Sequence, residues 1–271
     1  SLRTLPSLSV DSTNDGTASL ISTADQATLD LFALICERTA EVLRTTADWG
    51  ASGLRDGQYS VDLDVDAVCV ALLLGAGYDV LSEESGIQRA QGSDGRSIVV
   101  CDPLDGSTNA SLGLPWCATA LCLVVDGEPR VAMVTNLVTG DQYTAVKDRG
   151  ANRNGQPILV SAPTPLDDAI MAMNGLPARH WGWRQFRAMG AAALDIAAVA
   201  RGGFDGYVDT TTDSHGVWDY LASVLIVEEA GGTAIDAAGR DLTVLEHEAR
   251  RTPIVASNRA LLDVLLAARS R

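Results

Sequence analysis

The chain is organised around the stretch Asp102-Pro103-Leu104-Asp105-Gly106-Ser107-Thr108-Asn109. The apolar run directly before it, residues 98–101, predicts a buried strand, so that Asp102 stands where a strand ends. Active sites of α/β proteins are often found at such strand ends. Because Pro103 cannot continue a ladder of hydrogen bonds, we expect a sharp turn that lets Asp102 and Asp105 converge on one point.

The second half of the stretch is suited to binding an anion. Gly106, Ser107 and Thr108 form a loop that can open a short helix, and free N–H groups at a helix N-terminus attract anions. Two carboxylates beside such a site suggest Mg²⁺ together with phosphate. The alternative is an ordinary turn, because Asp, Pro, Gly and Asn are common turn residues.

Length and composition indicate one large domain. We predict a flexible, polar leader over residues 1–23 and a single domain over 24–268, made of two packed halves that divide near residue 160. No apolar run is long enough to span a membrane, so no membrane partner is expected. The five cysteines lack metal-ligand spacing and lie mostly in apolar runs, which is typical of reduced core residues in a cytoplasmic protein.

The net charge of −15, from 35 acidic and 20 basic residues, argues against a nucleic-acid partner. If the substrate is itself an anion, bound divalent cations would offset the repulsion between it and the protein. A generally acidic and soluble surface is the other explanation for the same charge.

Hydrophobic periodicity predicts a mixed chain of helices and strands without internal repeats. Asn154-Gly155 predicts a hairpin, and residues 163–187 are expected to form a loop. The predicted helices cover residues 24–46, 67–74, 188–200, 220–230 and 259–268. The predicted strands cover residues 60–66, 80–81, 98–101, 121–125, 131–134, 142–146, 205–209 and 252–256.

Three carboxylates alternate with apolar residues along the predicted strand 60–66. They are Asp62, Asp64 and Asp66, and on one face of a strand they would repel one another unless water or a metal ion surrounded them. A solvated strand face accounts for Asp62 and Asp64. Asp66 stands at the junction with the following helix and is the better candidate for a metal ligand.

Two more carboxylates stand at the ends of predicted elements. Glu83 follows a short apolar strand, as Asp102 does, so that two neighbouring strands can present their terminal carboxylates together. Asp219 directly precedes the predicted helix 220–230, where it is either a helix cap or a metal ligand.

Four stretches, in their order and spacing, resemble the inositol monophosphatase family of Mg²⁺-dependent, lithium-sensitive sugar phosphatases. The resemblance covers residues 24–268. The stretches are Glu83-Glu84-Ser85, Asp102-Pro103-Leu104-Asp105-Gly106-Ser107-Thr108-Asn109, Gly150-Ala151 with Asn154-Gly155-Gln156-Pro157-Ile158, and Trp218-Asp219 running into Glu229-Ala230-Gly231-Gly232.

The resemblance implies a mixed α/β (α+β) fold, a layered α/β/α/β/α sandwich of the inositol monophosphatase and fructose-1,6-bisphosphatase type. It also implies a homodimer and two or three Mg²⁺ ions in each site. The implied ligands of the first ion are Glu83, Asp102 and the carbonyl of Leu104, those of the second are Asp102, Asp105 and Asp219, and those of the third are Asp66 and Glu83.

The same resemblance implies the remaining roles. The N–H groups of Gly106 and Ser107 bind phosphate, and the Ser107 hydroxyl, hydrogen-bonded to Asp66 or Glu83, accepts a proton from a metal-activated water. Glu83, Ser107 and Asp66 are thus the implied catalytic residues. The implied substrate contacts are Asp105, Gly190, Ala191, Asp209 and Asp219.

Departures from the family pattern lie mainly on the substrate side. Ser107 stands where the family usually has Thr, and Asp209 stands where inositol enzymes usually have a Glu that contacts substrate hydroxyls. The loop after Asp209 is longer than in animal inositol enzymes, and Asp213 within it is a competing candidate for the same role.

We therefore expect a Mg²⁺-dependent phosphomonoesterase that hydrolyses a small phosphorylated metabolite, a polyol or sugar phosphate, with inositol 1-phosphate as the leading candidate. Fructose 1,6-bisphosphate and histidinol phosphate are the alternatives within the family. A catalytically weak member with a binding or regulatory role is the alternative from another class, although every expected ligand is retained.

Overall fold

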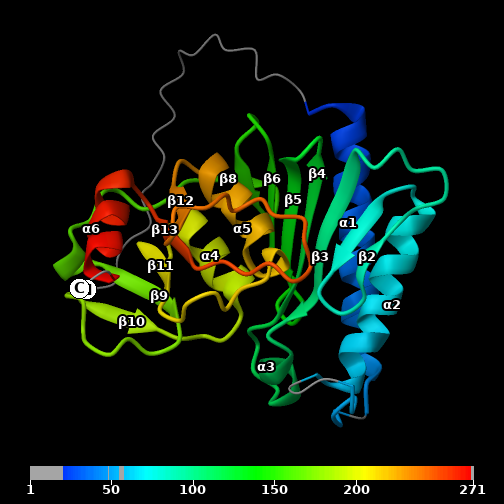
Figure 1. Ribbon diagram of the computed structural model, residues 1–271, viewed down its shortest axis with the longest axis horizontal. Helices are drawn as coiled ribbons and strands as arrows, with labels where there is room; N and C mark the ends of the chain where they lie inside the picture. The colour runs from blue at the N-terminus through cyan, green and yellow to red at the C-terminus, as the bar shows by residue number, and fades with distance from the viewer. Residues whose placement is uncertain (1–20, 48, 55–57, 270–271) are drawn as a thin grey trace.

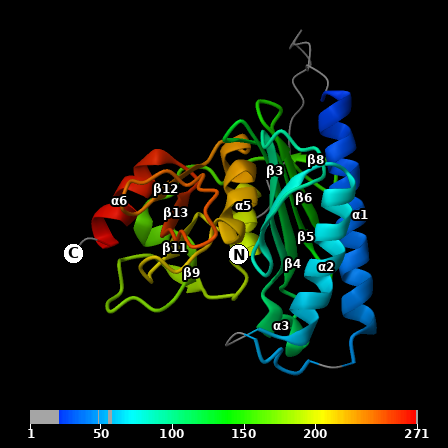
Figure 2. The ribbon, with the colours of Figure 1, turned by 45° about the vertical axis from the view of Figure 1, so that its right-hand side comes forward.

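The computed structural model describes residues 21–47, 49–54 and 58–269, and this part of the chain forms five layers (Figures 1 and 2). Helices α1 (Thr23–Thr45) and α2 (Ser60–Gly75) cover the outer face of an eight-stranded sheet. Helices α4 (Ala192–Ala200) and α5 (Val217–Glu229) fill the space between this sheet and a five-stranded one, whose far face is covered by α6 (Arg259–Arg269). The predicted α/β/α/β/α sandwich is confirmed.

The larger sheet runs in the order β2-β1-β3-β4-β5-β6-β7-β8. Its strands β1 and β3 pair in parallel, whereas the other neighbouring strands are antiparallel. The strands are β1 (Asp79–Ser82), β2 (Gly86–Gln88), β3 (Ser97–Asp105), β4 (Ala118–Val125), β5 (Glu128–Asn136), β6 (Gln142–Val146), β7 (Ala151–Arg153) and β8 (Gln156–Ile158). The short helix α3 (Ser107–Ser111) connects β3 to β4.

The smaller sheet runs in the order β10-β9-β11-β13-β12. Pairing is parallel from β10 through β9 to β11 and antiparallel from β11 through β13 to β12. The strands are β9 (Ile170–Asn174), β10 (Gln185–Arg187), β11 (Gly206–Asp209), β12 (Thr233–Asp236) and β13 (Pro253–Ala256), and the 3₁₀ helix η1 (Leu166–Asp168) precedes β9.

Neighbouring side chains on the central strands pack into different layers of the core. On β3, Val100 belongs to the inner core around α4 and α5, while Val99 and Cys101 pack with α1 and α2. On β11, Tyr207 enters the inner core and Val208 packs with α6. Because helices cover both faces of these strands, the strands read as nearly continuous apolar runs.

The strand predicted over residues 60–66 is wrong, because helix α2 begins at Ser60. Val61, Val65 and Cys69 recur at four-residue spacing and are all fully buried, which is the pattern of a helix with one buried stripe. The alternation of apolar and acidic residues is local, and the longer helical period outweighs it. Asp64 is consequently exposed on the other side of the helix.

The turn predicted at Pro103 is also wrong. Strand β3 pairs with β4 as far as Asp105, with an irregular register between Asp102 and Asp105 that accommodates the proline. The chain turns at Gly106 instead, which adopts the left-handed conformation and begins α3.

Other boundaries differ in detail. Residues 163–187 contain η1, β9 and β10 rather than a loop alone, and α4 begins at Ala192, later than predicted. Helix α5 begins at Val217, earlier than predicted, so Asp219 lies within its first turn. The other predicted elements are found, including the hairpin at Asn154-Gly155 between β7 and β8.

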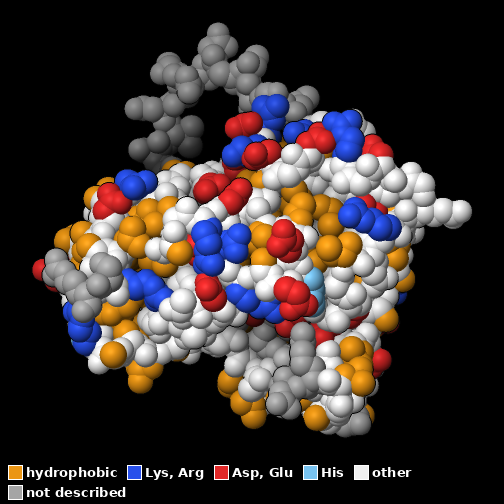
Figure 3. Space-filling model, viewed as in Figure 1, with side chains coloured by type: hydrophobic (Ala, Val, Ile, Leu, Met, Phe, Trp, Pro, Cys, Tyr) orange, Lys and Arg blue, Asp and Glu red, His pale blue; other side chains and the backbone are white. Residues whose placement is uncertain are grey.

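Of the predicted leader, residues 1–20 lie outside the described residues, and a single domain over 24–268 stays a prediction. No helix in the described part is long and apolar enough to cross a membrane. All five cysteines are buried, free thiols, as expected for core residues. On the face seen in Figure 3, acidic and basic side chains are intermingled.

Asp236, at the end of β12, is a fully buried carboxylate held by several donors. It accepts hydrogen bonds from the Thr252 N–H at 2.8 Å and from Nε of Arg240 at 2.7 Å. Burial by itself would raise the pKa of Asp236, but these hydrogen bonds and the Arg240 charge lower it overall. A carboxylate with a lowered folded-state pKa stabilises the protein above its unfolded-state pKa, and this contribution is lost as the pH falls through the folded-state pKa.

We therefore expect Asp236→Asn to lower the free energy of unfolding by about 1–3 kcal/mol at neutral pH and by progressively less in acid. Urea unfolding of both proteins from about pH 3 to about pH 7 measures the difference across the relevant range. Asp263→Asn, in the exposed pair with Arg259 on α6, is the control and should change stability little. A pH-independent loss in Asp236→Asn would contradict the assignment.

Candidate metal and substrate site

Glu83 and Asp102 are brought together by the parallel pairing of β1 and β3. Ser82 lies opposite Cys101 in the register, and the Glu83 N–H donates to the Cys101 carbonyl at 3.1 Å. Ser82 and Cys101 are therefore neighbours on adjacent strands, and Glu83 and Asp102 are the residues that come directly after them. Asp102 is buried, with 1% of its surface exposed.

Two further carboxylates lie in the same region, and each accepts a backbone N–H at a helix N-terminus. Asp219, in the first turn of α5, accepts the Gly216 N–H at 2.8 Å. Asp105, at the end of β3, accepts the N–H of Ala193 in the first turn of α4 at 2.7 Å. Glu83, Asp102 and Asp219 each offer a carboxylate oxygen, and these three oxygens lie within 4.8 Å of one another.

The electrostatics of this cluster fit a bound cation. Burial raises the pKa of Asp102 well above its usual range, and the negative charges of Glu83, Asp105 and Asp219 raise it further. Burial and the charge of Asp219 likewise raise the pKa of Asp105 to about 7. Divalent ions such as Mg²⁺ bind oxygen ligands and would relieve this repulsion. The donor set therefore fits Mg²⁺.

Asp66 and Leu104 lie beside this cluster. Asp66 is buried on α2 and accepts a hydrogen bond from the hydroxyl of Ser82 at the end of β1. The Leu104 N–H donates to Oδ1 of Asp102 at 3.0 Å, which fixes one side of that carboxylate. Asp66 and Asp105 lie outside the group of three converging oxygens found in the described residues.

The predicted phosphate loop is fixed by Gly106 and Asn109. Gly106 has φ +80° and directly precedes α3, whose first residue is Ser107. The Asn109 amide donates to the carbonyls of Trp116 at 2.8 Å and Met189 at 2.7 Å, which ties α3 to the segment before α4. In the described chain, the hydroxyl that donates to Asp66 is that of Ser82 rather than that of Ser107.

A cavity of about 150 Å³ adjoins the acidic cluster. Four of the predicted substrate contacts, Asp105, Gly190, Ala191 and Asp219, line it. Asp209 does not line it. The remaining lining residues are Met173, Asn174, Ala192, Asp195, Tyr207 and His215.

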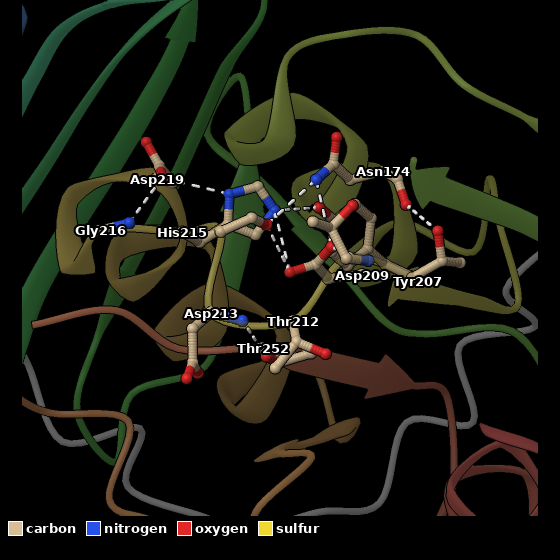
Figure 4. A network of polar contacts seen from close by, with 12 residues as sticks. Asn174, Tyr207, Asp209, Thr212, Asp213, His215, Gly216, Asp219 and Thr252 are labelled. Carbon is tan, nitrogen blue, oxygen red and sulfur yellow. Dashed lines mark hydrogen bonds and ion pairs between the residues drawn. The ribbon is translucent and has the colours of Figure 1, made fainter. Parts of the chain in front are cut away.

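Asp209 lies behind this cavity, fully buried and enclosed by donors. Its carboxylate accepts hydrogen bonds from the Asn174 amide at 3.1 Å, the Thr211 N–H at 2.9 Å and the Ser214 hydroxyl at 2.7 Å (Figure 4). Asn174 thus stands between Asp209 and the cavity. Asp213 forms an exposed ion pair with Arg240 at 2.5 Å.

His215 is a site residue that the sequence analysis missed. Its Nδ1 lies 3.1 Å from Oδ2 of Asp219 and its Nε2 lies 2.7 Å from the Tyr207 hydroxyl (Figure 4). Burial would lower the pKa of His215, but the hydrogen bond and charge of Asp219, with the charges of Asp209 and Asp105, raise it overall. Its position four residues before a candidate metal ligand was the available signal.

The comparisons with known proteins identify the family. The sequence model of the inositol monophosphatase family matches residues 20–271. The chain belongs to this family. It is 35% identical to an inositol-1-monophosphatase of Caulobacter vibrioides, over 79% of this chain and 87% of that protein.

Two other relatives carry different descriptions. A fructose-1,6-bisphosphatase/inositol-1-monophosphatase of Thermococcus kodakarensis is 34% identical, over 77% of this chain and 81% of that protein. The crystal structure of an extragenic suppressor protein, suhB from Bartonella henselae, superposes with a TM-score of 0.74 at 26% identity, covering 90% of this chain and all of that one. The family is therefore shown, while the names of its members differ.

The loop geometry gives a prediction for Gly106. A Cβ at this position would lie 3.0 Å from the Ala191 Cβ and 3.0 Å from the Trp116 carbonyl oxygen, in addition to the strain of a positive φ. We expect Gly106→Ala to lower the free energy of unfolding by on the order of 2–3 kcal/mol, because strain and a steric clash combine.

Gly113 provides the matched control. It also has a positive φ, +70°, but a Cβ there would meet open space. Gly113→Ala should therefore show only the cost of the left-handed backbone, about 1 kcal/mol. Urea unfolding of the two variants separates these contributions, and equal losses would show that the close approach of Gly106 to Ala191 has no energetic role.

Proposed function

We propose that this member of the inositol monophosphatase family is a Mg²⁺-dependent phosphomonoesterase that acts on a polyol or sugar phosphate, with inositol 1-phosphate as the first candidate. The observation that carries the proposal is the convergence of Glu83, Asp102 and Asp219 on one point beside a small cavity. Phosphate monoesters hydrolyse very slowly in water, so an enzyme for them depends on positioning and on charge.

The proposed ligands of a first ion are Glu83, Asp102 and the Leu104 carbonyl, those of a second are Asp102, Asp105 and Asp219, and those of a third are Asp66 with Glu83. The burial of Asp102 among the other carboxylates supports its position in two of these sets. Bound Mg²⁺ would lower the pKa of a water nucleophile and stabilise negative charge on the phosphoryl and leaving oxygens.

The chain's own groups would then orient the reactants. The N–H groups of Gly106 and Ser107 hold the phosphoryl group at the start of α3, where the left-handed Gly106 turns the backbone out of β3. The Ser107 hydroxyl accepts the proton of the attacking water and passes its own proton to Glu83 or Asp66. Asp105 is kept in place by backbone N–H groups of Ala192 and Ala193 at the start of α4.

The cavity supports a small substrate. Its volume, about 150 Å³, and its mixture of amide, hydroxyl, imidazole and carboxyl groups suit a single polyhydroxylated ring better than a nucleotide. Gly190 and Ala191 also line this space. Fructose 1,6-bisphosphate and histidinol phosphate remain the alternative substrates, the first because one relative's name includes fructose-1,6-bisphosphatase.

A catalytically weak member with a binding or regulatory role is the competing hypothesis. The suhB protein of Bartonella henselae, described as an extragenic suppressor, is a relative whose description names no reaction. Retention of every expected ligand favours catalysis in this chain. Phosphate release from a panel of phosphorylated metabolites, with and without Mg²⁺, decides between the hypotheses, and no release from any substrate would refute the enzymatic one. Assembly as a homodimer and a cytoplasmic location are further parts of the proposal.

The first mutational test concerns the shared ligand. Asp102→Asn should lower kcat at saturating Mg²⁺ by at least about 100-fold, because the variant loses a carboxylate that both principal ions share. Asp64→Asn is the control, since Asp64 is an exposed carboxylate on α2. A kcat for Asp102→Asn within about tenfold of the parent value would contradict the ligand assignment.

The second test concerns recognition of substrate hydroxyls. We expect Asp209 to act through Asn174, whose amide it holds at the cavity wall. Asn174→Ala and Asp209→Asn should both raise KM for the best polyol phosphate by about tenfold, near 1.4 kcal/mol, and should leave p-nitrophenyl phosphate hydrolysis nearly unchanged. These contacts exist in the ground state and in the transition state, so they affect KM more than kcat.

Asp213→Ala is the matched comparison, because Asp213 lies in the same loop but pairs with Arg240 at the surface. Asp213→Ala should change neither KM for the polyol phosphate nor the hydrolysis of p-nitrophenyl phosphate. If only Asp213→Ala raises KM, the longer loop performs the recognition. If Asn174→Ala impairs hydrolysis of p-nitrophenyl phosphate as much as that of the polyol phosphate, Asn174 supports the fold or the metal site instead.

A further inference from the structure

His247 contacts the segment that carries Glu83 and the segment that carries Asp219, two of the three carboxylates of the acidic cluster. It lies in the connection between β12 and β13, far in sequence from Glu83 and well separated from Asp219. Its Nε2 is 2.9 Å from the Glu83 carbonyl oxygen. Because a carbonyl oxygen only accepts hydrogen bonds, Nε2 carries the proton and donates it. The imidazole thus holds the backbone of the turn in which Glu83 lies.

The same ring is fixed against Trp218. The two ring centroids are 4.8 Å apart and the planes are inclined by 30°. Trp218 is 4% exposed and belongs to the inner core, so it offers a rigid surface. The Arg250 guanidinium also lies over Trp218, at 5.1 Å, and donates to the His247 carbonyl at 2.7 Å, which fixes the backbone of His247 as well.

Trp218 connects this contact to Asp219. Its ring packs directly on Gly216, where a Cβ would lie only 2.3 Å from a ring carbon. The Gly216 N–H in turn donates to the Asp219 carboxylate at 2.8 Å. One imidazole is therefore hydrogen-bonded to the Glu83 segment and packed against the segment that orients Asp219.

Such a link matters because the carboxylates repel each other. Glu83 lies in the turn between β1 and β2, and its N–H donates to the Cys101 carbonyl of β3. Charges of one sign in a poorly solvated site repel one another, which favours movement of the turn that carries Glu83 away from Asp102 and Asp219. A donor on the Glu83 carbonyl opposes that movement, and the groups around metal ligands commonly orient them in this way.

We propose that His247 is a positioning residue for the metal site, which keeps the Glu83 turn at the distance from Asp219 that a cation requires. This inference rests on the proposed function, because it presupposes that Glu83 and Asp219 hold a metal ion. His247 itself touches neither substrate nor the carboxylate oxygens in this assignment. Its effect is on the affinity of the site for Mg²⁺.

The test separates the hydrogen bond from the ring contact. His247→Gln keeps an N–H donor near the place of Nε2, His247→Phe keeps the ring against Trp218 and loses the donor, and His247→Ala loses both. Mg²⁺ affinity is measured by isothermal titration calorimetry on the full chain without substrate. The unfolding temperature in EDTA reports separately whether each variant is folded.

We expect His247→Phe and His247→Ala to bind Mg²⁺ about tenfold more weakly and His247→Gln to bind within about threefold of the parent. His180→Ala is the control, because His180 is an exposed histidine that packs against Trp183, away from the acidic cluster, and it should bind Mg²⁺ as the parent does. If His247→Ala does not fold, the comparison of the Gln and Phe variants still decides the question.

Parent-like Mg²⁺ affinity in His247→Phe would overturn the inference, and so would equal weakening in the Gln and Phe variants. Asp102→Asn, titrated in the same way, shows whether the metal site itself is correctly assigned. Loss of binding in Asp102→Asn together with unchanged binding in His247→Phe refutes the role of His247 alone. Unchanged binding in Asp102→Asn refutes the metal site and this inference with it.

Discussion

Burying Asp102 beside Glu83 and Asp219 concentrates negative charge where water screens it poorly. Much of the surrounding structure reduces the resulting repulsion. Three carboxylates of this region each accept a hydrogen bond from a backbone N–H group. Backbone N–H groups serve Asp102, Asp105 and Asp219, two of them from the first turns of helices or the residue before. These donors soften the repulsion without neutralising it, which leaves an excess of negative charge for a cation.

The topology is shaped by the same requirement. The larger sheet is antiparallel except between β1 and β3. Because parallel neighbours run in the same direction, the residues that follow two matched positions leave on the same side of the sheet. That pair delivers Glu83 and Asp102. Helices α4 and α5 then pack between the sheets with their N-termini at this edge, since Ala193 and Gly216 both donate to site carboxylates. The one parallel pair of the larger sheet therefore positions Glu83 and Asp102, and helix α5 adds Asp219.

The sequence predicted those parts of the site that follow from local order along the chain. A carboxylate that directly follows an apolar run or stands near the start of a helix can be recognised without knowing the fold, as for Glu83, Asp102 and Asp219. The strand predicted over residues 60–66 failed because burial of one helical stripe, a tertiary effect, overrode a local alternation. Strand β9 was missed because its apolar run is only four residues long and contains a single β-branched residue, Ile170.

The role of Asp209 shows why specificity is harder to derive than chemistry. The sequence correctly placed Asp209 at the end of a strand, but its exposure depends on Asn174 from β9 and on Ser214 from the following loop, which enclose it. A carboxylate so enclosed cannot itself turn towards a ligand. The Asn174 amide donates to Asp209 and Ser214, so its side-chain carbonyl is the group that it can offer on the cavity side. The residues of the acidic cluster follow apolar runs or lie near the start of a helix, and these local patterns can be seen in the sequence. The wall of the cavity is formed by side chains that meet only through tertiary packing, so a single sequence does not show which groups line it.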